Sequence, residues 1–162
     1  MQIRDAVHAD LPAILEIHND AIRTTTAIWD EHEVELDERR AWFDARRAAG
    51  LPVLVAEVDG GVIGFASYGP WRPKTGYRFT VENSVYVHPE HRGQGAANAL
   101  MPVLIDRARA GEVHSIVAGI EAANAGSIAL HEKLGFRRVA LLPEVGFKFG
   151  RWLDLAYLQL TL

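Results

Sequence analysis

The segment from Val85 to Leu104, VYVHPEHRGQGAANALMPVL, constrains the fold more than any other part of the chain. An apolar strand pattern passes through a Pro-containing turn and a glycine-rich loop directly into a helix pattern. Such a junction leaves backbone N–H groups free at the start of a helix, where the helix dipole adds partial positive charge. The sequence therefore predicts a strand–loop–helix unit that binds a phosphorylated ligand.

Gly93 and Gly95 make this loop suited to phosphate. A side chain at either position would hold phosphate oxygens away from the amides, and glycine also tolerates a positive φ. Arg92 adds a fixed positive charge beside them. We therefore expect a ligand that carries a diphosphate.

The composition fits a single globular domain over residues 1–162. Hydrophobic residues make up 49% of the chain and charged residues 23%, which allows a substantial core. The net charge of −4 argues against nucleic-acid binding through a broad basic surface. The absence of cysteine excludes disulfides, thiolate metal sites and a cysteine nucleophile.

The chain begins MQIRDAVHAD, which lacks the basic and then apolar pattern of a secretion signal. No apolar run approaches the roughly 20 residues that a membrane-spanning helix requires. We therefore expect a cytoplasmic protein that has no membrane partner.

Apolar periodicity and turn residues predict strands and helices in a mixed order. Asp10 is the expected N-cap of the first helix, and Pro102 is expected to kink a later helix or to free a carbonyl near Asn98. The expected strands lie at 2–5, 53–58, 62–68, 77–88, 113–120, 136–141 and 153–160, and the expected helices at 11–24, 37–50, 96–110 and 124–134. Hairpins joined to crossover helices indicate a mixed α/β fold rather than a doubly wound one.

Two nucleotide-binding motifs match the chain only in part. Residues 93–98 resemble the dinucleotide fingerprint, with Glu121 at the distance of a ribose-binding acid, but Asn98 replaces the third glycine. Residues 74–75 mimic the end of a P-loop, but Pro73 stands where its glycine must be. Neither motif has the surrounding elements that it needs.

A third interpretation rests on residues 92–97, RGQGAA, which read Arg or Gln, two residues, Gly, one residue, and Gly or Ala. This pattern resembles the acetyl-CoA pyrophosphate loop of the GNAT superfamily of N-acetyltransferases. Residues 124–136, NAGSIALHEKLGF, look like the second cofactor segment of that superfamily at the expected separation. The resemblance implies a mostly antiparallel sheet of about seven strands flanked by about four helices, with acetyl-CoA as cofactor.

The resemblance covers nearly the whole chain, through TTTAIWDE, WRPKTGYRFTVENSVYV and GFKFGRWLDLAYLQL. These segments look like the phosphinothricin acetyltransferase branch, whose members acetylate the α-amino group of phosphinothricin, methionine sulfoximine or methionine sulfone. Ala96 and Ala97 depart from the frequent bulky residue and glycine, and His131 stands where much of the superfamily has tyrosine. The resemblance also implies a homodimer.

The resemblance assigns the cofactor to the strand before the loop and to the helices after it. In the superfamily the pantetheine arm pairs with that strand, where an amide could serve the developing oxyanion. The expected cofactor-binding residues are Val85, Tyr86, Val87, Arg92, Gly93, Gln94, Gly95, Ala96, Ala97, Asn98, Asn124, Ser127 and Lys133. For the last three, helix capping and surface charge are the alternatives.

Glu82 and His131 are the expected catalytic residues. Alternation along the strand places Glu82 near the reactive end of the cofactor, where it would take a proton from the incoming ammonium with a pKa raised by burial. His131 would protonate the coenzyme A thiolate, since an unperturbed imidazole titrates at about 6.5. A Glu82 paired with Arg78 and a solvated His131 are the alternatives.

The loop that enters the catalytic strand concentrates positive charge. Guanidinium groups match carboxylates and phosphinates in a bidentate manner, which suits an anionic acceptor. The expected substrate-binding residues are Arg72, Lys74, Thr75, Gly76, Tyr77 and Arg78. A loop of solvated cations is the alternative, and Trp71, Phe149 and Trp152 could wall the pocket, form a dimer contact or pack in the core.

The leading hypothesis is an acetyl-CoA-dependent N-acetyltransferase that acts on the α-amine of a small amino-acid-like molecule. Because the chain has no cysteine, we expect direct attack in a ternary complex. The alternatives are a non-catalytic acyl-CoA-binding module, or an acetyltransferase for a protein N-terminus, a polyamine or an aminoglycoside. No metal is expected, because Pro89 breaks the helix that would align His88 with His91.

Overall fold

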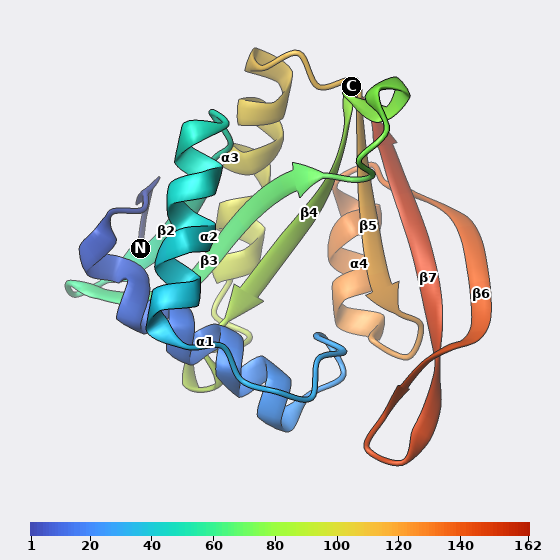
Figure 1. Cartoon of the computed structure of the whole chain (residues 1–162), viewed down its shortest axis with the longest axis horizontal. Coiled ribbons are helices and arrows are strands. Elements are labelled where there is room, and N and C mark those ends of the chain that lie inside the picture. The colour runs from blue at the N-terminus through green and yellow to red at the C-terminus, as the bar shows by residue number, and fades with distance from the viewer.

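The computed structural model describes all 162 residues as one seven-stranded sheet with four helices (Figure 1). The elements are β1 (Gln2–Asp5), α1 (Leu11–Thr24), α2 (Leu36–Ala48), β2 (Val53–Val58), β3 (Gly61–Pro70), β4 (Thr80–Val87), α3 (Ala96–Ala110), β5 (Ser115–Glu121), α4 (Ala125–Lys133), β6 (Arg137–Lys148) and β7 (Arg151–Thr161). The strand order is β1-β2-β3-β4-β5-β7-β6, and only β4 and β5 are parallel. The predicted fold class is confirmed.

Alternating side chains give the sheet two apolar faces. Leu54 and Ala56 of β2 join the core cluster that includes α3 and α4, whereas Val53 and Val55 join the cluster formed by α1 and α2. Helices α1 and α2 therefore cover one face, and α3 and α4 cover the other (Figure 1).

Strands β4 and β5 pair only at one end. Thr80–Glu82 lie opposite Ser115–Val117, and beyond them β4 stays with β3 while β5 stays with β7. The two strands diverge toward the start of α3 (Figure 1). The main-chain groups along the rest of β4 thus face an opening in the sheet.

Some element boundaries differ from those predicted. The strand expected at 77–88 begins at Thr80, because Thr75–Tyr77 form a turn of 3₁₀-helix. The final strands are longer than expected and meet at a two-residue turn, Phe149-Gly150, with φ of 53° and 72°. No helix is long and apolar enough to cross a bilayer.

Two expected local features take a different form. Asp10 precedes α1 but makes no capping hydrogen bond there, because its carboxylate accepts from Arg4 at 2.7 and 2.9 Å and from the Val7 N–H. Helix α3 continues through Pro102, which lies on its exposed side. Water can therefore reach the helix surface where proline removes a hydrogen bond.

Candidate functional site

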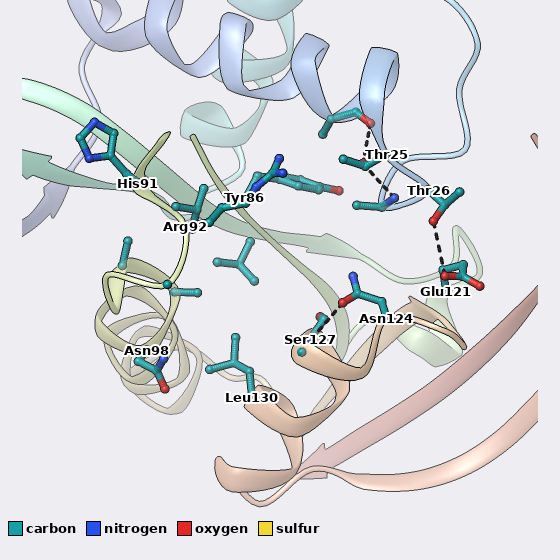
Figure 2. Close-up of a pocket in the computed structure, with 18 of the residues that line it drawn as sticks. Thr25, Thr26, Tyr86, His91, Arg92, Asn98, Glu121, Asn124, Ser127 and Leu130 are labelled. Carbon is teal, nitrogen blue, oxygen red and sulfur yellow. Dashed lines mark hydrogen bonds between the residues drawn. The ribbon is translucent and has the colours of Figure 1, made fainter. Parts of the chain in front are cut away.

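The opening between β4 and β5 leads into a cavity of about 810 Å³, walled by β4, the start of α3, α4 and the loop after α1 (Figure 2). A smaller cavity of about 120 Å³ continues between the two strands. Val85, Tyr86, Glu121, Asn124 and Ser127 line both cavities. We call the two cavities together the cleft.

The glycine-rich loop forms one end of the cleft. Gly93 and Gly95 have φ of 74° and 87°, and no atom lies within 4 Å of the position that a Cβ would take on either. Gly95 is the N-cap of α3 and gives it no side-chain hydrogen bond, so the first amides of the helix stay free. This end of the cleft fits a diphosphate.

Arg92 lies in the cleft wall, where its Nη2 donates to Asp20 Oδ2 at 3.3 Å. This contact ties α1 to the phosphate loop. The arginine side chain is half exposed, so a bound diphosphate would compete with Asp20 for the guanidinium. Figure 2 shows Arg92 beside the loop that enters α3.

The main chain of β4 turns two of its three expected amides toward the cleft. His88 N–H donates to Ile63 O of β3 at 2.8 Å. Because main-chain groups alternate between the two edges of a strand, the N–H groups of Val85 and Val87 point to the opposite edge. Tyr86 pairs its main chain with β3 and contributes its side chain to the cleft.

Most of the expected cofactor-binding residues lie together around the cleft. Those that line it are Val85, Tyr86, Val87, Arg92, Gly93, Gly95, Ala96, Ala97, Asn98, Asn124 and Ser127. Asn124 also caps α4, because its side chain accepts from the Ser127 N–H at 3.1 Å. Gln94 bonds instead to Glu90 O, and Lys133 is exposed on α4, so neither side chain lines the cleft.

The sequence did not reveal the wall opposite α4. Thr25, Thr26 and Ala27, in the loop after α1, line the cleft, and Arg151 of β7 joins them. Thr26 Oγ1 donates to the buried carboxylate of Glu121 at 3.4 Å (Figure 2). The sequence pointed to this wall only through the segment TTTAIWDE, which resembles the family. The resemblance assigned no role to any single side chain of that segment.

Glu82 lies where β4 and β5 begin to separate. Its Oε1 is 3.0 Å from the position that a Cβ on Gly119 would take, so the missing side chain on β5 makes room for this carboxylate. Burial raises the pKa of Glu82, and the positive charge of Arg72 opposes that rise. A half-buried carboxylate with a raised pKa suits proton abstraction.

His131 is buried, and both nitrogens of its ring are hydrogen-bonded. Nδ1 lies 2.8 Å from Ser127 O, which can only accept, so the neutral ring carries its proton there. Nε2 lies 3.0 Å from Asn83 Nδ2 and accepts from it, while Asn83 Oδ1 is buried without a partner. Burial lowers the pKa of His131, which favours this neutral form.

The expected acceptor loop, residues 72–78, is exposed and lines neither cavity. Arg72 stacks over Trp71, with its Cζ 5.0 Å from the ring centroid, and its positive charge lowers the pKa of Glu82. Arg78 stacks over Phe79 at 4.3 Å and donates to Thr75 O. Arg72 is therefore the loop cation that the structure associates with the carboxylate.

Histidines 88 and 91 lie close together, with ring centroids 5.6 Å apart. The structure gathers no group of three or more His, Cys, Asp or Glu side chains that could hold a metal ion. His88 Nδ1 instead accepts from the Glu90 N–H.

The chain matches the acetyltransferase (GNAT) family over residues 14–136, and it belongs to that family. This match confirms the predicted family and class of enzyme. A curated relative from Pseudomonas paraeruginosa, an L-methionine sulfoximine/L-methionine sulfone acetyltransferase, is 56% identical over 99% of this chain and 94% of its own length.

Two solved structures resemble this one over nearly its full length. A phosphinothricin acetyltransferase from Sinorhizobium meliloti in complex with acetyl-CoA has a TM-score of 0.97 and 40% identity, over 99% of this chain and 88% of that one. A ribosomal-protein-alanine N-acetyltransferase from Brucella melitensis has a TM-score of 0.99 and 52% identity, over 100% of both chains. Acetyl-CoA is thus the cofactor of this family, as predicted, while the relatives differ in acceptor.

Proposed function

We propose that this protein transfers the acetyl group of acetyl-CoA to the α-amino group of a small amino-acid-like molecule of the methionine sulfoximine, methionine sulfone or phosphinothricin type. The observation that carries the proposal is the half-buried Glu82 at the point where the sheet opens, with a pKa that burial raises and that the positive charge of Arg72 lowers. The carboxylate can receive a proton, and the guanidinium favours an acceptor that carries an anionic group.

Residues that line the cleft, together with Glu82 beside it, would each serve a different part of the reaction. The loop at 92–97 would hold the diphosphate, and the N–H of Val85 or Val87 would donate to the thioester carbonyl as negative charge develops on its oxygen. Acetyl-CoA supplies the activated acyl group. Glu82 would accept a proton from the ammonium of the acceptor, so that the free amine attacks the carbonyl carbon. As the C–N bond forms and the C–S bond breaks, the nitrogen loses a second proton, which balances the proton that the departing thiolate gains.

The acid role of His131 stays a prediction, and the geometry sets its condition. To donate a proton, the ring must first gain one on Nε2, and Asn83 must turn so that its unpaired Oδ1 accepts from that nitrogen. Burial opposes the second proton because it lowers the pKa of the ring. In the form seen here, His131 holds Asn83 in the cleft wall.

The acceptor class is tested by measuring thiol release from acetyl-CoA with a panel of amines. We expect kcat/KM for methionine sulfoximine, methionine sulfone and phosphinothricin to exceed that for the amide of methionine sulfone by about tenfold to a hundredfold, the value of one charge-assisted contact. A peptide that begins with alanine serves as the competing acceptor. A higher kcat/KM for the peptide, or equal values for the acid and its amide, would contradict the proposal.

A homodimer is part of the proposal, and the outer hairpin of β6 and β7 supports it. Strand β6 is a long edge strand, and an exposed edge with apolar side chains is a surface for association. Six large apolar residues of the hairpin are between 49% and 62% exposed: Val139, Leu141, Val145, Phe147, Phe149 and Trp152. We also place the enzyme in the cytoplasm, where acetyl-CoA is available.

The homodimer is tested by light scattering on Trp152→Arg. The wild-type protein should have twice the chain mass of 17.9 kDa, and the variant should have the monomer mass with a normal far-UV spectrum. The control is Arg137→Glu, which changes the charge of an exposed side chain on β6 without removing apolar surface. A wild-type monomer, or a variant that stays dimeric at micromolar concentration, would argue against this surface.

A further inference from the structure

Lys148 is an unusual lysine because its side chain is buried, with 1% of its surface exposed. Its Nζ lies 2.7 Å from Ile22 O, 2.8 Å from Thr25 O and 2.5 Å from Ile28 O. An ammonium group has three N–H donors, so all of them are used. Burial lowers the pKa of Lys148, and Asp30 and Glu31 oppose that change.

These contacts join segments that lie far apart in the sequence. Ile22 belongs to the last turn of α1, where carbonyl groups lack helical partners and a cation interacts favourably with the helix dipole. Thr25 and Ile28 belong to the loop that follows. Lys148 comes from the end of β6, and the turn that follows it returns the chain to Arg151 in the cleft wall.

The loop held by Lys148 is the cleft wall formed by Thr25, Thr26 and Ala27. Ala27 also lines the smaller cavity, as does Gly119, the residue of β5 beside which the proposed base Glu82 lies. Thr25 Oγ1 donates to Ala21 O and Trp29 Nε1 donates to Thr26 O within this segment, and Thr26 Oγ1 reaches the sheet through a long side-chain hydrogen bond to Glu121 at 3.4 Å. Only Lys148 fixes the main chain of both halves of the loop to the sheet.

We propose that Lys148 is a positioning residue whose ammonium sets the loop at 25–29 as the acceptor-side wall of the cleft. This inference rests on the proposed function. Lys148 does not itself line the cleft and binds no residue of the phosphate loop, so it acts on the reaction through the carbonyls that it binds, one of which belongs to the lining residue Thr25. Its loss should weaken acceptor binding more than cofactor binding.

The first test is Lys148→Met, which keeps an unbranched side chain one atom shorter than lysine and leaves three carbonyl groups without a donor. We expect the KM for methionine sulfoximine to rise about tenfold or more, with the dissociation constant for coenzyme A changed by less than about threefold. Amide exchange of residues 25–31 should quicken. Arg137→Met, a change to an exposed cation of the same strand, should alter none of these quantities.

The second test restores the charge chemically. Because the chain has no cysteine, Lys148→Cys carries a single thiol that 2-bromoethylamine converts, in denaturant before refolding, into a lysine analogue. We expect the aminoethylated protein to regain the acceptor KM and the slow exchange, and the same protein treated with 2-bromoethanol to regain neither.

Three results would overturn the proposal. They are equal recovery with either reagent, an unchanged acceptor KM in Lys148→Met, and a fall in stability so general that neither aminoethylation nor Lys148→Arg restores the loop. The exchange measurement needs no turnover. A wild-type protein that lacks activity would therefore refute the proposed function and still leave the control of the loop by Lys148 to be judged.

Discussion

Glu82→Gln is expected to lower kcat by about a hundredfold or more, because a carboxamide cannot accept the proton of the incoming ammonium. The dissociation constant for acetyl-CoA should stay the same, since the loop proposed to hold the diphosphate lines the larger cavity and Glu82 does not. Steady-state kinetics and calorimetry measure the two effects separately. Glu112→Gln, at an exposed carboxylate without a hydrogen-bond partner, is the control. A Glu82→Gln enzyme with normal kcat would refute the role of Glu82 as the base.

The same carboxylate should set the acidic limb of the pH profile. Burial raises the pKa of Glu82, so kcat/KM should increase with pH as the carboxyl loses its proton, at a pH above the usual range of a glutamate. Arg72→Gln removes the charge that opposes this rise and should move the limb to higher pH. Arg78→Gln, whose guanidinium stacks on Phe79, should leave the limb in place. If the acidic limb of the pH profile persisted in Glu82→Gln, it would report the titration of another group and not of Glu82.

Local patterns predicted the elements whose conformation depends on near neighbours. Asp59-Gly60 forms the tight turn between β2 and β3, with φ of 49° and 80°, as the sequence of that turn indicates. The glycine-rich loop before α3 was predicted in the same way, because the positive φ of Gly93 and Gly95 also follows from glycine itself. Strand β6 was predicted too short, because register shifts near Arg138 and near the positive φ of Glu144 interrupt the period-2 pattern.

The sequence predicted the site residues whose positions depend on neighbouring residues in the chain. It did not predict contacts between segments that only the fold brings together. The alternation of side chains along β4 predicted the face of the strand on which Glu82 lies. Its position beside Gly119 depends on the register between β4 and β5. The contacts of Lys148 span 120 to 126 residues. Nothing in the local sequence distinguishes this buried ammonium from the exposed amine of Lys133, which was expected to bind the cofactor.

Gly95→Ala is expected to weaken acetyl-CoA binding by about tenfold to a hundredfold. Gly95 has a φ of 87° at the N-cap of α3, and a Cβ in that region costs about 1 to 2 kcal/mol. The strain would be relieved by rotation of the amides that begin the helix, and each lost hydrogen bond to a charged group costs about 1.5 to 3 kcal/mol. Calorimetric titration with acetyl-CoA measures the effect.

Gly60→Ala is the matched control, because it separates strain from binding. Gly60 has a φ of 80° in the turn between β2 and β3, and its Cβ position, like that of Gly95, has no atom within 4 Å. The two substitutions should lower the unfolding temperature by similar amounts, and only Gly95→Ala should raise the dissociation constant. If both variants bound acetyl-CoA as tightly as the wild-type protein, the amides at the start of α3 would not be the groups that bind the diphosphate. If both bound it equally weakly, the loss would reflect general destabilisation of the fold.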